Sequence, residues 1–392
     1  MKPELNIGIA GAGIGGLAAA ALLARDGHRV QVFDQFDAPR PIGSGLVIQP
    51  VGQMVLHEID ALAAARSKGT LIRRMLGHEA DSGRPVLDVW YDRAEIPARF
   101  GLAIHRASLF DTILKAAQDA GAELIQSHRV TAIAAGHLHF ADGSSTTFNL
   151  TIDAMGAGSP ATPLTAKPLP YGAIWGTVAW PKTDLPLDQL TQSYRRADRM
   201  IGVLPIGSLP GDTTNSAAIF WSLPRDGHNA WRDAPLDHWR DEATALWPDF
   251  APFAAQITDH DQMTMARYSH GTLRKPIAEA HAIIGDAAHR ASPQLGQGAN
   301  MALLDAMALA MALRHAPLDE ALPHYAAARR WHTRLYQVMS WAFTPQYQCD
   351  SKVLPMIRDR ALFPLSQIPP VSGILTKLVC GTLLPPMGSL TR

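Results

Sequence analysis

The sequence has few cysteines, no excess of either charge and no long apolar run. Its two cysteines, Cys349 and Cys380, are far apart and form no Cys-x-x-Cys pair, which favours a reducing compartment, and we expect the cytoplasm. Lys and Arg together number 35, as do Asp and Glu, so the net charge gives no reason to expect nucleic acid or an anionic membrane as a partner. No uncharged apolar stretch reaches the ~20 residues that a membrane span requires.

The length and composition indicate a globular protein of more than one domain. The chain has 392 residues, of which 47% are hydrophobic and 18% charged. This length exceeds one compact core, so we expect two domains or one large interleaved pair. The N-terminus resembles a signal peptide in placing Lys2 before an apolar run, but glycines interrupt that run and a dinucleotide motif explains them better.

The first 34 residues carry a nucleotide-binding pattern. A short buried strand is followed at once by Gly-Ala-Gly-Ile-Gly-Gly, from Gly11 to Gly16, then by an Ala- and Leu-rich helix and a second strand that ends at Asp34. Gly11 allows the tight turn, Gly13 lets a pyrophosphate approach the backbone, and Gly16 lets helix and strand pack closely. Asp34 is placed to bind ribose hydroxyls. The pattern predicts a dinucleotide site and leaves the kind of dinucleotide open.

A second strand-loop-helix connection lies between Ala282 and Asn300. An apolar run stops at Gly285 and Asp286, and a helix is predicted to begin near Asn300, with Asn300 as its N-cap. An acid at a strand end suits hydroxyl groups, and a glycine loop aimed at a helix N-terminus suits an anion or a polar ring edge. Taken alone, an ordinary connection explains the segment equally well. The intervening loop contains Pro293, Gly296 and Gly298.

Three shorter features leave alternatives open. Glycines around Gly45 indicate close approach to something flat, or a plain turn. Arg106 lies at the start of a helix that Ser108 is expected to cap, where it either serves a ligand or is a solvated charge. His137 and His139 share one face of a predicted hairpin, but no Asp, Glu or Cys completes a metal site nearby, so we reject that interpretation.

The middle of the chain, from about residue 160 to 269, reads as aromatic-rich strands without long intervening helices. This pattern predicts an antiparallel sheet that forms a second domain inserted into the first and covers a ligand. Tyr194, Phe220 and Trp221 are candidates for its pocket, with ordinary core or surface packing as the alternative for each.

The C-terminal part reads as helical. A helix is predicted over residues 318–344, with Tyr325, Trp331, Leu335 and Met339 on its core face. The apolar, proline-rich tail from Pro364 is expected to form a helix pair packed on the surface, and a weak contact with a membrane surface is compatible with it.

With these pieces in place, the chain resembles the group A FAD-dependent monooxygenases, the aromatic hydroxylases of the para-hydroxybenzoate hydroxylase fold. The segments that carry the resemblance occur in the family's order, and the last is the most specific. They are Gly11–Gly16 with Asp34, His105–Leu109, Phe148–Thr162, and Gly285–Asn300.

The resemblance implies an α/β fold. A Rossmann-like FAD-binding domain of the glutathione reductase type 2 (GR2) class carries an inserted, mainly antiparallel β substrate domain, and helices follow at the C-terminus. The expected division is 1–160 for the first part of the FAD domain, with a β excursion near 75–100 that joins the substrate domain, then 161–272 for the substrate domain, 273–318 for the second part of the FAD domain, and 319–392 for the helices.

The resemblance also implies FAD as the nucleotide. Asp34 then takes the adenosine ribose, Arg106 reaches the flavin, and Asp286 takes the ribityl hydroxyls. A flavin-proximal loop with Pro293, Gly296 and Gln297 is the place expected for catalysis, although no side-chain catalyst is assigned. The residues expected to contact FAD are Gly11, Gly13, Ile14, Gly15, Gly16, Asp34, Gln35, Arg40, Gly45, Leu46, Arg106, Val130, Asp286, Pro293, Gly296, Gly298, Ala299 and Asn300.

In the family, NAD(P)H reduces the flavin, O2 then forms a flavin C4a-hydroperoxide, and one oxygen atom is transferred to the substrate. The implied activity is therefore hydroxylation of an aromatic or polycyclic small molecule, with FAD as cofactor and NAD(P)H as co-substrate. An oligomer is compatible with this assignment, and no metal is expected.

One departure from the family pattern affects the reductant. The third motif usually reads Gly-Ala-Asp-Gly-x-x-Ser-x-x-Arg, but here Met155 replaces the acid and Thr162 the arginine. A thioether holds no charge and accepts only weak hydrogen bonds, and Asp153 is the nearby residue that could substitute. Two alternatives stay open: an oxidase or dehydrogenase of the same fold with altered or absent NAD(P)H use, and a flavin-binding regulatory protein without turnover.

Overall fold

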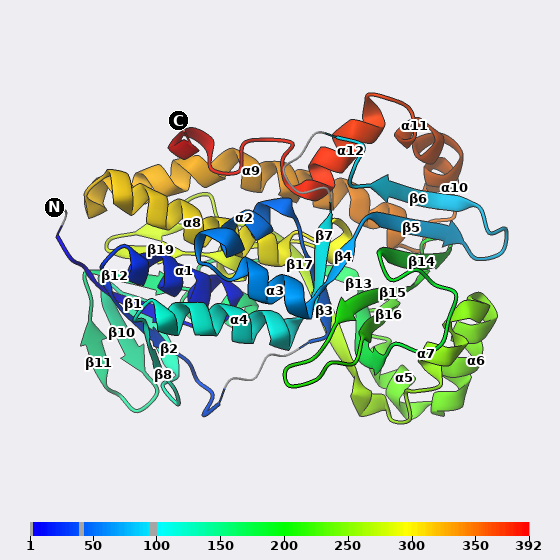
Figure 1. The fold of residues 1–392 in the computed structure, drawn as a ribbon, viewed down its shortest axis with the longest axis horizontal. Helices are drawn as coiled ribbons and strands as arrows, with labels where there is room; N and C mark the ends of the chain where they lie inside the picture. Colours follow the sequence, from blue (N-terminus) through cyan, green and yellow to red (C-terminus); the bar gives the residue numbers. More distant parts are fainter. Residues whose placement is uncertain (1–2, 39–42, 95–99, 392) are drawn as a thin grey trace.

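The computed structural model describes residues 3–38, 43–94 and 100–391. Two large sheets organise it, one mostly parallel and one mostly antiparallel. Figure 1 shows the two side by side along the long axis of the molecule, with helix α9 (Leu318–Tyr347) running past both. The predicted class is confirmed: an α/β protein with a Rossmann-like sheet, an antiparallel sheet from the middle of the chain, and C-terminal helices.

The mostly parallel sheet holds the N-terminal glycine turn. Its strands pair in parallel except for β18 with β19. Parallel sheets are normally covered on both faces. Here helices α1 (Ile14–Arg25), α4 (Arg106–Asp119) and α8 (Gly298–His315) contribute to one core cluster, and a small sheet of β9 (Val130–Ala134), β10 (His137–Phe140) and β11 (Ser145–Thr147) contributes to another. The strand order is β18 (Ile277–Ala278), β19 (His281–Ile283), β12 (Leu150–Asp153), β1 (Asn6–Ala10), β2 (Arg29–Phe33) and β8 (Glu123–Ile125).

Helix α1 is the central helix of this half. Residues 17–23 are at most 1% exposed, so the helix is apolar all round and has no solvent face along this stretch. Four consecutive alanines, residues 18–21, let the neighbouring helices α4 and α8 approach closely. Because α1 starts at Ile14, its N-terminus lies directly at the glycine turn.

The second sheet has eight strands and draws on distant parts of the chain. Strands β5 and β6 come from residues before 91, and β5 pairs in parallel with β14; every other neighbouring pair is antiparallel. The strand order is β20 (His289–Arg290), β17 (Met263–Thr272), β13 (Lys167–Ala179), β16 (Ser216–Pro224), β15 (Arg199–Gly207), β14 (Gln189–Arg195), β5 (Arg74–Glu79) and β6 (Pro85–Trp90).

The two faces of this sheet have different covers. On one face Ile174, Val178 and Trp221 pack with residues of α6 (Leu236–Leu246) and α7 (Ala251–Ala254), near the short helix α5 (His228–Asp233). On the other face Tyr194 and Phe220 belong to a cluster that includes Tyr347 of α9. Since neighbouring residues of a strand point to opposite faces, this division assigns each side chain of the sheet to one side.

A third, small antiparallel sheet and two short helices connect these halves. The sheet has the order β3 (Gly45–Ile48), β7 (Gly101–His105) and β4 (Thr70–Ile72), and α2 (Pro50–Glu58) and α3 (Leu62–Lys68) lie between β3 and β4 in the chain. After α9 the chain forms α10 (Val353–Ile357), a π-helical turn (Arg358–Leu362), α11 (Phe363–Ser366) and α12 (Val371–Cys380). In the part of the chain that the structure describes, no helix is both long enough and apolar enough to cross a membrane.

Three local predictions need correction. His105, rather than Ser108, caps α4, because its ring Nδ1 accepts a hydrogen bond from the amide of Ala107 at 3.1 Å. Helix α8 begins at Gly298, so Asn300 lies inside the helix and is not its N-cap. Trp331 was expected on the core face of α9, but its side chain is 60% exposed.

Candidate cofactor site

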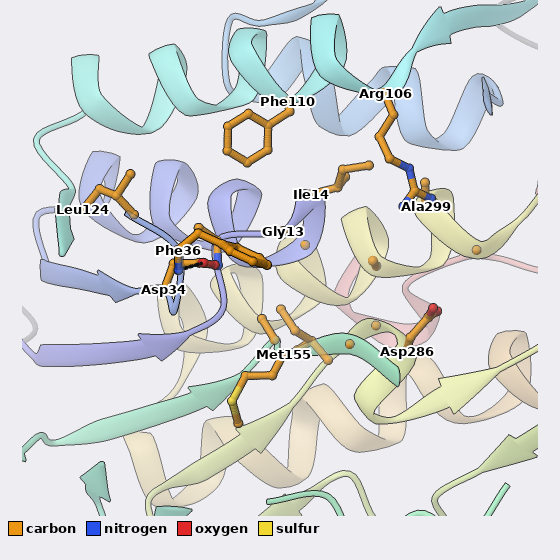
Figure 2. A pocket seen from close by; sticks show the side chains of 18 of the residues that line it. Gly13, Ile14, Asp34, Phe36, Arg106, Phe110, Leu124, Met155, Asp286 and Ala299 are labelled. Carbon is orange, nitrogen blue, oxygen red and sulfur yellow. Dashed lines mark hydrogen bonds between the residues drawn. The ribbon is translucent and has the colours of Figure 1, made fainter. Parts of the chain in front are cut away.

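A cavity of about 420 Å³ opens where the carboxyl ends of the parallel strands meet the N-terminal ends of α1 and α8. This edge of an open α/β sheet is where such folds usually bind nucleotides. Figure 2 shows Asp34 toward one end of the cavity, Arg106 and Asp286 toward the other, and Gly13 between them. The lining residues are Ala12, Gly13, Ile14, Gly15, Asp34, Phe36, Ala38, Arg106, Phe110, Leu124, Gln126, Ala154, Met155, Gly156, Ile284, Gly285, Asp286, Gly298, Ala299 and Ala302.

The three glycines of the first motif differ in what a side chain would meet. A Cβ on Gly16 would lie 2.1 Å from the carbonyl oxygen of Gly11, and one on Gly11 would lie 2.6 Å from that of Ala154. A Cβ on Gly13 would meet no heavy atom closer than 4.0 Å, the carbonyl oxygen of Ala154. Packing therefore requires Gly11 and Gly16, whereas Gly13 leaves the backbone at the start of α1 open to the cavity. A free helix N-terminus of this kind suits a pyrophosphate.

Asp34 is held at the end of β2 by two backbone amides. Its Oδ2 accepts a hydrogen bond from the amide of Ala12 at 2.9 Å, and its Oδ1 accepts one from the amide of Phe36 at 3.1 Å. These bonds fix the carboxylate beside the glycine turn, and it lines the cavity. A carboxylate in this position can accept hydrogen bonds from a ribose.

Arg106 and Asp286 approach the far end of the cavity from different elements (Figure 2). Arg106 begins α4, and Asp286 lies in the turn that follows β19. Both side chains are accessible from the cavity, but the cavity lies inside the protein, so few water molecules can surround them. That burial lowers the pKa of Arg106 and raises the pKa of Asp286, and the charges of His289 and Arg106 oppose the shift of the carboxyl. The pair presents one cationic and one anionic group to a ligand.

The N-terminus of α8 lies at the cavity as well. Gly298 and Ala299 line it, and Gln297 at the N-cap makes no side-chain capping bond, so the first amides of this 18-residue helix are available. The preceding loop turns at Gly296, whose φ of 61° is in the left-handed region that glycine adopts readily. Helix dipole and free amides together favour an anionic or electron-rich group here.

Asn300 is fully buried and joins the loop to the small sheet. Its side-chain oxygen accepts a hydrogen bond from the amide of Gln49 at 2.8 Å. Its side-chain nitrogen donates to the carbonyls of Val47 at 3.1 Å and Gly296 at 2.9 Å. Asn300 therefore fixes the position of the loop that contains Gly296, and its own side chain does not line the cavity.

A buried charge network lies behind Asp286 and was missed from the sequence. The Oδ2 of Asp305 accepts hydrogen bonds from the amide of Gly285 at 2.9 Å and from Nε2 of His289 at 2.6 Å. Its Oδ1 accepts one from Nε of Arg329 at 2.7 Å. Burial alone would raise the pKa of Asp305, but the charges and hydrogen bonds of His289 and Arg329 outweigh it and lower the pKa to about 2.

This network has a sequence signal. Asp305 is the lone acid in the otherwise apolar run Met301–Met311. A lone charge in an apolar helix face predicts a buried partner. Because Gly285 precedes Asp286, the network anchors the backbone that presents Asp286 to the cavity.

The departure at the third motif has a structural counterpart. Met155 lines the cavity next to Gly11, and its side chain also packs on the aromatic cluster around Phe33. Asp153 does not take over its role, because it is fully buried and its two oxygens accept hydrogen bonds from the amide of Met155 and from the hydroxyl of Ser159. Burial raises the pKa of Asp153, and those two bonds oppose the shift.

Thr162, at the arginine position of the motif, has a connecting role. Its hydroxyl donates a hydrogen bond to the carbonyl of Ala287 at 2.6 Å. This bond joins the loop after β12 to the turn that carries Asp286. Neither Met155 nor Thr162 presents a charge to the cavity.

Several residues expected to contact FAD lie outside the cavity lining. Gly45 is required by packing, since a Cβ there would lie 2.2 Å from a methyl group of Ile206. The side chain of Val130 packs among Phe33, Leu138 and Phe140. Arg40 lies outside the described residues. The others that do not line the cavity are Gly11, Gly16, Gln35, Leu46, Pro293, Gly296 and Asn300, and Gln297 of the loop expected for catalysis does not line it either.

The three pocket candidates of the large sheet separate onto its two faces. Trp221 packs against Trp239 of α6 at a ring distance of 6.4 Å, on the face away from α9, which contradicts its assignment to a substrate pocket. Phe220 is on the opposite face, 4.5 Å from the ring of Trp175. Tyr194 is buried beneath the guanidinium of Arg358. Within the described ranges no group of three or more His, Cys, Asp or Glu is arranged to hold a metal ion.

Comparison with protein families agrees with this geometry. Residues 181–335 match the family model described as an FAD binding domain, and residues 9–40 match that of an NAD(P)-binding Rossmann-like domain. The second match covers the glycine turn and Asp34, and the first includes Asp286 and α8.

Curated relatives match most of the chain. A kynurenine 3-monooxygenase of Xanthomonas campestris pv. campestris (strain 8004) is 28% identical over 86% of this chain and 77% of its own length. A 6-methylpretetramide 4-monooxygenase of Streptomyces rimosus is 24% identical over 96% of this chain and 92% of its own. A 3-amino-4-hydroxybenzoate 2-monooxygenase of Streptomyces cremeus is 27% identical over 83% of each chain.

Solved structures support the fold. A 2-methyl-3-hydroxypyridine-5-carboxylic acid oxygenase has a TM-score of 0.78 at 18% identity and covers 96% of this chain and 97% of its own. A variant of Klebsiella pneumoniae HpxO complexed with FAD has a TM-score of 0.81 at 21% identity and covers 97% and 99%. The arrangement of the two sheets and the C-terminal helices is therefore shared with these proteins.

Proposed function

We propose that this chain, which belongs to the FAD-dependent monooxygenases of the para-hydroxybenzoate hydroxylase fold, adds one oxygen atom from O2 to an electron-rich aromatic ring. The substrates in the names of its relatives guide the choice, because kynurenine carries an aromatic amine and aminohydroxybenzoate carries both an amine and a hydroxyl. An amino or hydroxyl group donates electrons to the ring and makes its carbon atoms more nucleophilic toward an electrophilic oxygen. The substrate class is thus a small aromatic amine or phenol.

The observation that carries the cofactor assignment is the set of polar groups that line the cavity between the N-termini of α1 and α8. Asp34 would hold the adenosine ribose, the open backbone at Gly13 the pyrophosphate, and Asp286 the hydroxyls of the ribityl chain. Gly298 and Ala299 would direct their amides toward the pyrimidine edge of the flavin ring, and Arg106 would reach the same end of the cavity, beside Ala299 (Figure 2). Bound FAD supplies the redox chemistry, and the protein supplies its orientation and surroundings.

Arg106 and the α8 amides have a defined electrostatic role in this proposal. Positive potential near a flavin favours its reduced form, which carries a negative charge at neutral pH, so these groups would stabilise the state that reacts with O2. The Asp305 network keeps the turn at Asp286 rigid, and no side chain of this chain is required to act as acid or base. This division of roles agrees with the absence of charge at Met155 and Thr162.

The substrate face of the large sheet is proposed to be the one that carries Trp175 and Phe220. The indole nitrogen of Trp175 donates a hydrogen bond to the hydroxyl of Tyr268 at 2.9 Å, and burial holds the pKa of that phenol above its usual range. Two aromatic rings with one neutral phenol suit a flat apolar substrate that needs a single polar contact.

NAD(P)H is the reductant typical of the family, and the relatives favour hydroxylation over the alternative of an oxidase or dehydrogenase. The test is a reaction of the purified, FAD-loaded protein with NADH or NADPH across a panel of aromatic amines and phenols. Substrate-stimulated NAD(P)H oxidation with a product heavier by one oxygen is expected. Peroxide as the only product, or oxidation of the substrate without NAD(P)H, would instead establish the alternative.

We also propose a cytoplasmic location. Cys349 and Cys380 are both free thiols, which is the usual state in a reducing compartment.

A further inference from the structure

The C-terminal helices expose an unusual amount of apolar surface. Of the fourteen large hydrophobic side chains that are exposed in the described residues, eleven lie between residues 331 and 374. On α9 these include Trp331 at 60%, Val338 at 60% and Trp341 at 70%. Isolated exposed apolar residues are normal, but a concentration of this kind marks a contact surface. The other members are Val353, Leu354, Met356, Ile357, Leu362, Leu365, Ile368 and Ile374.

These residues lie on elements that touch one another. Helix α10 contacts α9, and α11 contacts α12. Helix α12 packs on α9 through a cluster that includes Leu335 and Leu375. Leu335 follows Trp331 by four residues and precedes Val338 by three, so these side chains are neighbours on the helix surface. The exposed face of α9 therefore lies next to the face on which α12 packs. Figure 1 shows α10, α11 and α12 gathered above the β5–β6 hairpin, and both α11 and α12 contact β6.

A longer segment around these residues carries a net positive charge, which the neutral total of the chain conceals. Residues 326–391 contain seven Lys and Arg but only two Asp and no Glu. The two acids are engaged, since Asp350 accepts a hydrogen bond from the hydroxyl of Tyr171 and Asp359 pairs with Arg358. Five bases are exposed, and none of them forms an ion pair within the described part of the chain. They are Arg330, Arg334, Lys352, Arg360 and Lys377.

Tryptophan and arginine are combined at one point of this surface. The guanidinium carbons of Arg330 and Arg334 lie 5.4 and 5.2 Å from the centre of the exposed Trp331 ring. Tryptophan is enriched where proteins meet the headgroup layer of a bilayer, and long basic side chains extend from an apolar surface toward anionic headgroups. Apolar side chains with basic neighbours are the features of a helix that lies on a membrane without crossing it.

From these observations we propose that the surface formed by the part of α9 from residue 326 onward, α10, α11 and α12 docks on an anionic lipid membrane. A second copy of the chain fits the surface less well. A two-fold dimer would place this surface of one copy against the same surface of the other. The five unpaired bases of one copy would then lie near those of its partner, and like charges repel. An anionic bilayer offers both the apolar layer and the negative charge that the surface lacks.

The test is co-sedimentation of the FAD-loaded protein with vesicles of phosphatidylcholine alone or mixed with phosphatidylglycerol. We expect binding to the mixed vesicles that falls at least tenfold between low salt and 0.5 M salt, because screening weakens the charge contribution. Two double variants, Trp331→Ser with Trp341→Ser and Arg330→Glu with Arg334→Glu, should each reduce binding at least tenfold while retaining bound flavin. Leu187→Ser is the matched control, since Leu187 is 43% exposed and outside this surface, and it should bind as the wild type does.

Three outcomes would overturn the proposal. They are the absence of wild-type binding to mixed vesicles at low salt, equal binding to neutral vesicles, and equal binding by both double variants. Size-exclusion chromatography with light scattering is run on the same proteins. A concentration-dependent dimer that the double variants abolish, without vesicle binding by the wild type, would assign the surface to a second copy instead. If a double variant lost its flavin, the single changes Trp341→Ser and Arg334→Glu would replace it, each with a smaller loss of the same sign expected.

Discussion

Asp305 is expected to stabilise the folded protein strongly although it lies outside the cofactor cavity. The change Asp305→Asn keeps the shape of the side chain and removes its charge, which leaves Arg329 buried at 3% exposure without its counter-ion. Breaking a buried pair in this way typically costs about 3–5 kcal/mol. A domain is usually stable by about 5–15 kcal/mol in total. The unfolding midpoint in urea should therefore fall markedly, which circular dichroism can follow.

The pH dependence provides an independent estimate of the same contribution. The pKa of Asp305 falls from 3.8 in the unfolded chain to about 2 in the folded protein. A depressed pKa stabilises the fold by an amount that is complete above the unfolded value and is lost as the pH falls through the folded value. The difference corresponds to about 2 kcal/mol, lost between about pH 4 and pH 2. The Asn variant should lack this part of the acid unfolding profile.

Two controls separate this effect from a general loss of charge. Asp119→Asn removes an exposed partner of Lys115, and an exposed pair is worth about 0–1 kcal/mol. The double variant Asp305→Asn with Arg329→Met removes both charges and should be destabilised by less than the sum of the single changes, because no uncompensated charge remains. An Asp305→Asn protein that unfolds within about 1 kcal/mol of the wild type would refute the assignment of a buried, coupled pair.

Two further predictions concern the cavity itself. Asp286→Ala should yield folded protein without bound FAD, seen as loss of flavin absorbance after purification. The control Asp241→Ala, on the exposed side of α6, should retain the flavin. Full flavin occupancy in Asp286→Ala would show that Asp286 is not part of the site. Met155→Asp should raise the rate of flavin reduction by NAD(P)H in stopped-flow measurements, since it restores the acid of the family pattern, while Met155→Leu should leave it unchanged, and equal rates in both variants would show that this position does not limit reduction.

The sequence allowed the local geometry of the first motif to be predicted well. Gly11, Gly13 and Asp34 lie within one strand-turn-helix-strand unit, so short-range backbone rules determine their arrangement. The second motif was located, but the start of its helix was placed two residues too late. The signal used was a capping residue, whereas the side chain of Asn300 is taken up by Gln49, about 250 residues away in the chain. Long-range bonds of this kind leave no trace in a local pattern.

The errors in the β and C-terminal regions have a similar cause. Phe220 and Trp221 are both aromatic and point to opposite faces of the large sheet. The sequence does not show which face α6 covers, and in the structure α6 covers the face of Trp221. Trp331 has the spacing expected of a core residue. In the structure, however, α12 packs on the neighbouring face of α9, the one that carries Leu335 and Met339, and Trp331 remains exposed. Periodicity identifies an apolar stripe and does not identify what covers it.

The burial of α1 has a consequence for the order in which the protein can be completed. This helix is apolar on every side, and its closest helical neighbour, α8, begins at residue 298. During synthesis α1 therefore leaves the ribosome long before the segment that covers it. The two acids that line the cavity, Asp34 and Asp286, are separated in the same way, so the cavity is complete only when about three quarters of the chain has emerged. Until then the exposed helix is a site for aggregation or chaperone binding.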